Sequence, residues 1–293
     1  MTIIQDKTTI EKLPHYIWIN GTFVAYQEAK INVMTHSLHY SGGVFEGERA
    51  YNGKIFKLEQ HVQRLIESAN ILRMNIPYNF AEIIEAHHAL IKRNNIKDAY
   101  IRPLVWQGSE SLNLVNSNSS DNLLIASVSS MAREAKPLSL HIANWRKCHP
   151  NSLPPQCKSS GHYNMMIVCQ KEAKSLGYDD AILLDWQGFI AECTTTNIFF
   201  VKDGKLFTPI ADGFLNGITR QTIIELAKNL GIDVKEEHIT LDRLIEFDEC
   251  FVTGTAMEVK GVESVEIKDE KIIFKDYVIT DILKNAYFEL VRK

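Results

Sequence analysis

The sequence predicts an α+β fold in which helices and strands are mixed. Alternating apolar and polar residues mark several strands, whereas apolar residues at helical spacing mark the helices. No regular strand–helix–strand repeat is visible, which argues against a doubly wound parallel sheet. The 293 residues are enough for two domains with a sizeable core. A polar stretch that contains Pro137 predicts a linker over 131–138, between a smaller domain in 1–130 and a larger one in 139–293.

The first half opens with a β-hairpin and continues through further strands and two helices. Tyr16–Ala25 alternates in polarity around Asn20-Gly21, which is a strong signal for a tight turn. Amphipathic spacing predicts helices over 58–72 and 80–94. The other strands expected in this half cover 30–34, 43–51, 54–57, 100–106 and 122–128.

The second half is richer in strands. Residues 181–208 are typical of a meander with turns at Gln187-Gly188 and Asp203-Gly204. Gly231 is well placed to end a helix as its C′ residue. The helices expected here cover 164–176, 221–230 and 277–291.

Composition excludes several classes of protein. A net charge of −4 with a pI of about 6.2 argues against nonspecific attraction to nucleic acid. No apolar run approaches the roughly 20 residues that cross a bilayer, and the first ten residues do not resemble a secretory signal. The five cysteines are odd in number and widely spaced, so we expect reduced thiols in a cytoplasmic protein. The histidines do not fall at ligand spacing near them, and no metal site is expected.

A lysine, a tyrosine and a glutamate form the most informative constellation. Lys158 lies just before a predicted helix, Tyr163 follows five residues later, and Glu192 returns on an apolar strand. The lysine can form a Schiff base with an aromatic aldehyde, the tyrosine can bond its ring hydroxyl, and the carboxylate can keep a pyridine nitrogen protonated. A lone lysine here is usually a solvated residue, but together the three residues predict a pyridoxal-phosphate enzyme.

Two segments are candidates for binding a phosphate group. Gly217-Ile218-Thr219 leads into the predicted helix over 221–230, where backbone N–H groups and the helix dipole attract anions. Gly254-Thr255 ends an apolar strand, and exposed amides of such small residues can bind oxyanions. Taken alone, each segment is equally typical of an ordinary helix cap or turn.

Three arginines lie where apolar residues surround them. Arg49 and Arg102 are on predicted strands, and Arg64 is on the helix over 58–72. A structural salt bridge is the default role of such arginines. Bidentate guanidinium groups are also what a pocket for amino-acid carboxylates requires, and Arg64 is placed to reach a phosphate.

Together these segments resemble the fold-type IV pyridoxal-phosphate enzymes, and most closely the branched-chain amino acid aminotransferases. The likeness covers nearly the whole chain, from His36-Ser-Leu-His-Tyr40 and Val44-Phe-Glu-Gly-Glu-Arg49 to Thr253-Gly-Thr-Ala-Met-Glu258. Single motifs are modest, whereas their order and spacing are specific. The resemblance implies a smaller N-terminal α/β domain and a larger C-terminal β-rich pseudobarrel.

The resemblance also implies a role for each candidate residue. Lys158 would carry the cofactor aldimine, Tyr163 would contact the ring hydroxyl and Glu192 the pyridine nitrogen. Tyr40 and the loop Gly108–Val115 would be lent by a partner subunit, which implies a homodimer. The implied phosphate site comprises Arg64, Gly217, Ile218, Thr219, Gly254 and Thr255. The implied substrate pocket comprises Tyr40, Phe45, Gly47, Arg49, Tyr100, Arg102, Thr255 and Ala256.

The implied activity is ping-pong transamination of L-leucine, L-isoleucine and L-valine with 2-oxoglutarate, as part of branched-chain amino acid biosynthesis. A D-amino-acid transaminase or an aminodeoxychorismate lyase of the same fold is the alternative, although these relatives generally lack Tyr100-Ile-Arg-Pro103 beside Val44–Arg49. A catalytically inactive binding protein is the remaining alternative. His162 stands where asparagine is common, and Ser129–Ala135 lacks an aromatic turn that many members have beside the pocket.

Overall fold

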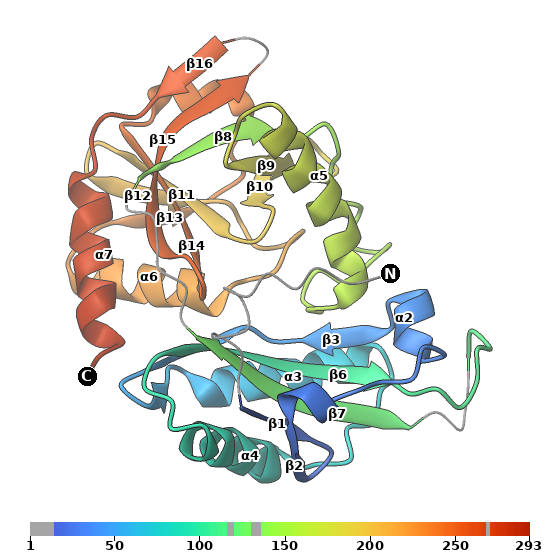
Figure 1. Cartoon of the computed structure of the whole chain (residues 1–293). Coiled ribbons are helices and arrows are strands. Elements are labelled where there is room, and N and C mark those ends of the chain that lie inside the picture. The colour runs from blue at the N-terminus through green and yellow to red at the C-terminus, as the bar shows by residue number, and fades with distance from the viewer. Residues whose placement is uncertain (1–14, 116–119, 130–135, 268–269) are drawn as a thin grey trace. The chain divides into compact units, whose positions relative to one another are not determined.

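A computed structural model describes residues 15–115, 120–129, 136–267 and 270–293. The chain forms two compact units (Figure 1). Unit 1 comprises Met1–Arg133 with Cys157–Gly161, and unit 2 comprises Glu134–Gln156 with His162–Lys293. Part of the predicted linker, 131–135, lies outside the described residues, as does most of the segment 129–135. The mixture of helices and strands confirms the predicted α+β class.

Unit 1 is built on an antiparallel sheet of order β2-β1-β7-β6-β4-β5, with β3 also paired to β6. The longest strands, β6 and β7, pair over their whole length and form the centre of the sheet (Figure 1). The strands are β1 (Tyr16–Ile19), β2 (Thr22–Ala25), β3 (Gly43–Phe45), β4 (Glu48–Tyr51), β5 (Lys54–Ile55), β6 (Ala99–Gln107) and β7 (Asp121–Ser129).

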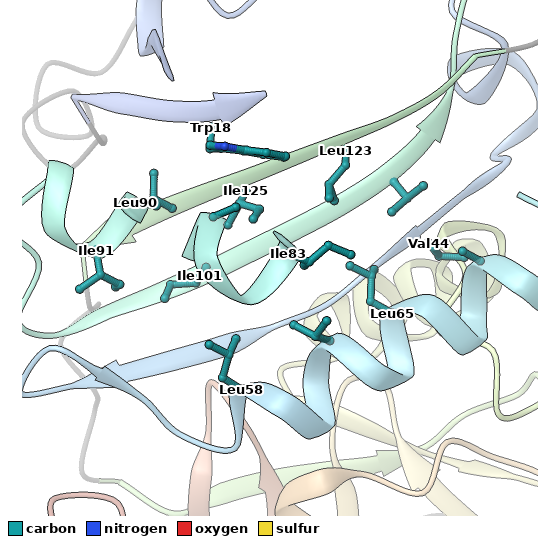
Figure 2. Packing of buried hydrophobic residues seen from close by; sticks show 14 of the residues in the cluster. Trp18, Val44, Leu58, Leu65, Ile83, Leu90, Ile91, Ile101, Leu123 and Ile125 are labelled. Carbon is teal, nitrogen blue, oxygen red and sulfur yellow. The ribbon is translucent and has the colours of Figure 1, made fainter. Parts of the chain in front are cut away.

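Two amphipathic helices, α3 (Leu58–Ile71) and α4 (Phe80–Arg93), supply the core of unit 1. Asn79 caps α4 in a reciprocal capping box with Glu82. Figure 2 shows Leu58 and Leu65 of α3 and Ile83 of α4 among sheet residues such as Ile101. The short helices η1 (Tyr26–Glu28) and α2 (His36–Tyr40) precede β3.

Unit 2 carries a larger sheet of order β10-β9-β8-β15-β14-β11-β12-β13, with β16 paired to β15. Its strands are β8 (Leu138–Ile142), β9 (Asp180–Leu184), β10 (Ile190–Cys193), β11 (Asn197–Lys202), β12 (Lys205–Thr208), β13 (Val234–Glu236), β14 (Glu249–Gly254), β15 (Glu258–Ile267) and β16 (Glu270–Ile273). Its helices are α5 (Tyr163–Ser175), α6 (Ile218–Asn229), α7 (Val278–Leu290) and η3 (Leu241–Glu246), and η2 (Ser160–His162) precedes α5. None of the helices in the described residues is both long and apolar enough to span a bilayer.

Most predicted elements are confirmed. The Asn20-Gly21 turn has both residues at positive φ (45° and 86°), as a type I′ hairpin requires. Gly231 follows α6 with φ 75°, which confirms its place at the end of that helix. The helix begins three residues earlier than expected, so Ile218 and Thr219 belong to its first turn.

Two predictions about strands are wrong. Residues 30–34 form no strand, because the Asn32 side chain accepts the backbone N–H of Met34 and the Asn32 carbonyl accepts that of Thr35, which closes a turn. Residues 181–208 are not one meander. β10 pairs with β9, whereas β11 pairs with β14 and β12, so the two hairpins occupy different parts of the sheet.

Candidate active site

Lys158 is held by β3 and α3 of unit 1, although it is distant from them in sequence. Its backbone N–H donates to Ser68 Oγ at 3.0 Å, and its carbonyl accepts the N–H of Phe45 at 3.1 Å. Ser159 forms an isolated bridge with Val44. These contacts fix the backbone of the lysine, and its Nζ lies 5.0 Å from the centre of the Phe45 ring.

Strand register places four predicted substrate residues on one face of the unit 1 sheet, and Gly47 lies beside them against the Tyr100 hydroxyl. Arg49 lies directly opposite Tyr100, and cross-strand partners project from the same face. Alternation along the strands adds Arg102 to this face, and Phe45, which is opposite Leu104. The Arg102 guanidinium donates to Tyr100 Oη at 2.9 Å and stacks over the Phe45 ring at 4.5 Å. We call the set Phe45, Gly47, Arg49, Tyr100 and Arg102 the substrate face.

Gly47 leaves the space that the Tyr100 hydroxyl occupies. A Cβ atom at position 47 would lie 2.2 Å from Tyr100 Oη, which is shorter than any real contact. The strand is also interrupted here, because β3 ends at Phe45 and β4 begins at Glu48. Gly47 therefore allows the Tyr100 hydroxyl to pack directly against the backbone.

Arg64 lies beside a carboxylate that the sequence did not single out. Its Nε and Nη2 donate to the two oxygens of Glu46 at 2.6 and 2.8 Å, and His61 Nδ1 lies 2.8 Å from the same carboxylate. Burial alone would raise the pKa of Glu46, but the Arg64 guanidinium and then His61 hold it well below its usual range. Glu46 is thus an ionised, fully buried anchor for the predicted phosphate arginine.

In unit 2, Glu192 has a basic partner that sequence reasoning missed. The Lys147 ammonium donates to Glu192 Oε1, and both side chains are largely buried. Burial lowers the pKa of His162, and the charge of Lys147 lowers it further. A signal for Lys147 was present, because a carboxylate in an apolar strand is costly unless a cation pairs with it. Tyr163 begins α5, directly after His162.

Both predicted phosphate segments of unit 2 lie beside one residue, Asn197 on β11, one through its side chain and the other through strand pairing. Its Oδ1 accepts the N–H of Gly217 at 3.2 Å, and its Nδ2 donates to the Leu215 carbonyl at 3.0 Å. In register, Asn197 lies opposite Thr253, the residue before Gly254. The structure therefore brings together two segments that the sequence could treat only separately, and Asn197 was not predicted.

The start of α6 has the character of an anion site. Gly217 is the N-cap, and the first N–H groups of any helix have no acceptor within it. A Cβ at Gly217 would lie 2.2 Å from Asn197 Oδ1. Thr219 is buried in this first turn, whereas Arg220 turns away to Asn216, the Pro209 carbonyl and Glu236.

The two segments that a partner subunit was predicted to receive lie against each other. Tyr40 at the end of α2 is exposed, and its hydroxyl donates to the Leu112 carbonyl at 3.0 Å. Large apolar side chains are exposed in the same two stretches, namely Ile31, Val33, Met34, Leu38, Leu114 and Val115.

Known proteins share this chain's family signature and structure. A model described as class IV amino-transferase matches residues 43–265. A "Probable branched-chain-amino-acid aminotransferase" of Rickettsia bellii is 60% identical over 278 residues, 94% of this chain and 96% of the relative. A crystal structure of the T.th. branched-chain amino acid aminotransferase with pyridoxamine 5'-phosphate has a TM-score of 0.90 at 36% identity, covering 96% of this chain and 95% of its own.

A second structure of the T.th. enzyme contains N-(5'-phosphopyridoxyl)-L-glutamate. It has a TM-score of 0.90 at 36% identity and covers 95% of this chain and 94% of its own. These matches confirm the resemblance drawn from the sequence and the fold that it implied. Enzymes of the matched family use pyridoxal 5'-phosphate, which confirms the predicted cofactor.

Proposed function

The chain belongs to the class IV aminotransferase family, and from this premise we propose that it transfers the amino group of L-leucine, L-isoleucine and L-valine to 2-oxoglutarate. The products are branched-chain 2-oxo acids and L-glutamate, formed in a ping-pong reaction. The name of the Rickettsia bellii relative supports the branched-chain substrates. The adduct in the T.th. enzyme supports glutamate as the other amino acid.

The substrate face of unit 1 carries this proposal. The pocket must accept an aliphatic side chain in one half-reaction and a γ-carboxylate in the other. Phe45 provides an apolar surface, and the Arg102 guanidinium over the same ring provides a cation. With the Tyr100 hydroxyl and Arg49 on the same face, one surface offers both kinds of contact.

The residues present fit the cofactor. Glu192 is a buried carboxylate suited to a protonated pyridine nitrogen, and Lys147 is its ion-pair partner in the structure. The N-terminus of α6 and Thr219 suit a phosphate, with no space for a Cβ at Gly217. When bound through Lys158, pyridoxal phosphate supplies a ring that stores the negative charge left on the substrate.

Lys158 then has a second role, as the group that moves the proton. Its Nζ, free once the substrate amine has taken its place, would take the proton from the substrate Cα and deliver it to the cofactor carbon, acting as base and acid in turn. Tyr163 would donate to the ring hydroxyl and hold the ring in one orientation. Arg49, Tyr100 and Arg102 hold the carboxylates of the substrate, which aligns the Cα–H bond with the lysine.

A homodimer is part of the proposal. Tyr40 and the loop Gly108–Val115 are assigned to the substrate pocket of the partner subunit, and the Tyr40–Leu112 hydrogen bond joins these two segments within one chain. The apolar side chains exposed around Tyr40 are the kind that a stable interface buries. Sedimentation of the purified protein tests this, and a monomer that retains full activity would contradict it.

A cytoplasmic location completes the proposal. All five cysteines are free thiols, and Cys157, Cys169, Cys193 and Cys250 are buried. Burial raises the pKa of Cys157 to about 11. Free thiols of this kind are typical of proteins in a reducing compartment.

Two measurements test the function. Formation of 2-oxo acid from L-leucine with 2-oxoglutarate is compared with its formation from D-alanine, and L-leucine is the expected substrate. Borohydride reduction followed by tryptic mass mapping is expected to locate the pyridoxyl group on Lys158. Product from D-alanine alone would favour a D-amino-acid transaminase, and a colourless protein without the tag would favour a binding protein.

A further inference from the structure

Two buried carboxylates flank Gly47 on the core side of unit 1. Glu46 and Glu48 are both 0% exposed. Glu46 is compensated by the guanidinium of Arg64 on α3. Glu48 instead faces α4, where His87 Nε2 lies 3.2 Å from its Oε2 and is also fully buried. The proposed chemistry uses neither Glu48 nor His87.

The geometry requires a proton between Glu48 and His87. His87 Nδ1 lies 2.7 Å from the Ile83 carbonyl, which can only accept, so Nδ1 carries a hydrogen. If His87 were neutral, Nε2 would direct a lone pair at the Glu48 carboxylate, and the two would repel each other. A proton between them removes this repulsion. Apart from His87, no described residue has a donor placed to hydrogen-bond either oxygen of Glu48. His87 is thus the group that compensates the burial of this carboxylate.

The strand that carries Glu48 is short. β4 contains four residues, follows the interruption at Gly47, and is flanked on its outer side by β5, which contains two. Glu48 is opposite the buried Ile101, and Arg49 is opposite Tyr100. Anchoring Glu48 from the core side therefore fixes the direction of Arg49 on the other side.

We propose that the Glu48–His87 pair is a positioning device that fixes β4 against α4 and thereby sets Arg49 on the substrate face. The inference rests on the proposed function, which assigns this face to the carboxylates of the substrate. It names two positioning residues, because neither side chain lies on the face that meets the substrate. Their contribution should therefore be visible in substrate binding rather than in cofactor binding.

The first test separates KM from kcat. Glu48→Leu is expected to raise the KM for the amino acid about tenfold, since a small misplacement of a binding group has effects of this order, with little change in kcat or cofactor affinity. Glu48→Gln is expected to remain near wild type, because its amide N–H can donate to Nε2 of a neutral His87. An unchanged KM in Glu48→Leu, or an equal rise in both variants, would overturn the proposal.

Leu90→Ala provides the matched control. Leu90 is fully buried on the same helix, so its truncation destabilises unit 1 while both members of the pair are kept. It is expected to lower the melting temperature but leave KM unchanged. If Leu90→Ala raises KM as much as Glu48→Leu, the effect is loss of stability and the proposal fails.

The choice of substrate and a hydrogen-exchange measurement allow the positioning proposal to be tested even if the proposed function is wrong. The KM is measured with whichever of L-leucine and D-alanine the wild type uses, because both carry an α-carboxylate. Hydrogen exchange of the peptide covering 45–51 follows β4 directly and needs no turnover. Faster exchange there in Glu48→Leu than in Leu90→Ala supports the anchor, and equal exchange overturns it.

Discussion

At the scale of single residues, Lys158 is the side chain on which the proposed chemistry depends. Its anchoring bonds to Ser68 and Phe45 use the backbone, so Lys158→Ala should leave the fold intact. Turnover is expected to fall by a factor of about a thousand or more, because both the covalent attachment and the proton transfer are lost. Circular dichroism and a transaminase assay check the two halves of this prediction. Full activity in the variant would refute the assigned mechanism.

At Gly47, the methyl group of an alanine would be enough to change the shape of the substrate face. In Gly47→Ala the new Cβ would displace Tyr100 Oη, which lies 2.2 Å from its position. Arg102 would lose its hydrogen bond to that hydroxyl. We expect the KM for L-leucine to rise about tenfold or more and cofactor affinity to stay unchanged. Steady-state kinetics and cofactor titration measure both, and an unchanged KM would contradict the prediction.

Lys147 is the ion-pair partner of Glu192, the carboxylate that we propose meets the cofactor ring. Lys147→Met leaves Glu192 buried without its cation, which costs about 3–5 kcal/mol when a buried pair is broken from one side. We expect weaker cofactor binding and a lower melting temperature. The double variant Lys147→Met with Glu192→Gln removes the charge as well. It should regain stability without regaining the cofactor absorbance, and recovery of both would show that the pair has only a structural role.

At the scale of elements, the first turn of α6 is shaped by β11. Gly217→Ala would push its Cβ into Asn197 Oδ1 and misalign the N–H groups at the start of the helix. The alanine itself is compatible with the backbone, since Gly217 has φ −61° and ψ 140°. Phosphate is expected to bind less tightly, with cofactor affinity reduced about tenfold, the loss of about one good hydrogen bond to a charged group. Fluorescence titration with pyridoxal phosphate measures it, and unchanged affinity contradicts it.

The elements also show where local sequence patterns are sufficient. The hairpin at Asn20-Gly21 and the helices α3 and α4 were predicted because turn chemistry and helical periodicity are local. No strand forms over 30–34, because the Asn32 side chain accepts the backbone N–H of Met34 and closes a turn there. Residues 181–208 do not form the expected meander, because β11 pairs with β14, which comes much later in the chain.

At the scale of the whole molecule, two buried ion pairs make stability depend on pH. Burial lowers the pKa of His87, but Glu48 raises it more, so it lies above the ordinary 6.5. The protonated His87 therefore stabilises the folded state below pH 6.5, and this stabilisation is lost as the pH rises through the pKa that His87 has in the folded protein. Glu46 is the opposite case, because Arg64 lowers its pKa below the ordinary 4.5. The ionised Glu46 stabilises the folded state above pH 4.5, and this stabilisation is lost as the pH falls through the pKa of Glu46 in the folded protein.

The melting temperature is therefore expected to be highest between about pH 4.5 and 6.5, as far as these two groups determine it. Differential scanning calorimetry over a pH series measures it. The double variant Glu48→Leu with His87→Leu should remove the decline on the alkaline side and leave the acid side unchanged. An alkaline decline that persists in the double variant would show that another group causes it.

The sequence by itself determined the family, the cofactor and most of the elements, because motif order and periodicity are properties of the chain alone. It also named the residues of the substrate face, through the resemblance, although only strand register shows that they share one side of a sheet. Tertiary structure decided the partners of the buried charges. Lys147 and Glu192 are 45 residues apart, and Glu48 meets His87 only because α4 packs on the sheet. Such pairs form between residues that are far apart in the sequence, so they depend on how the elements pack and cannot be read from a local pattern.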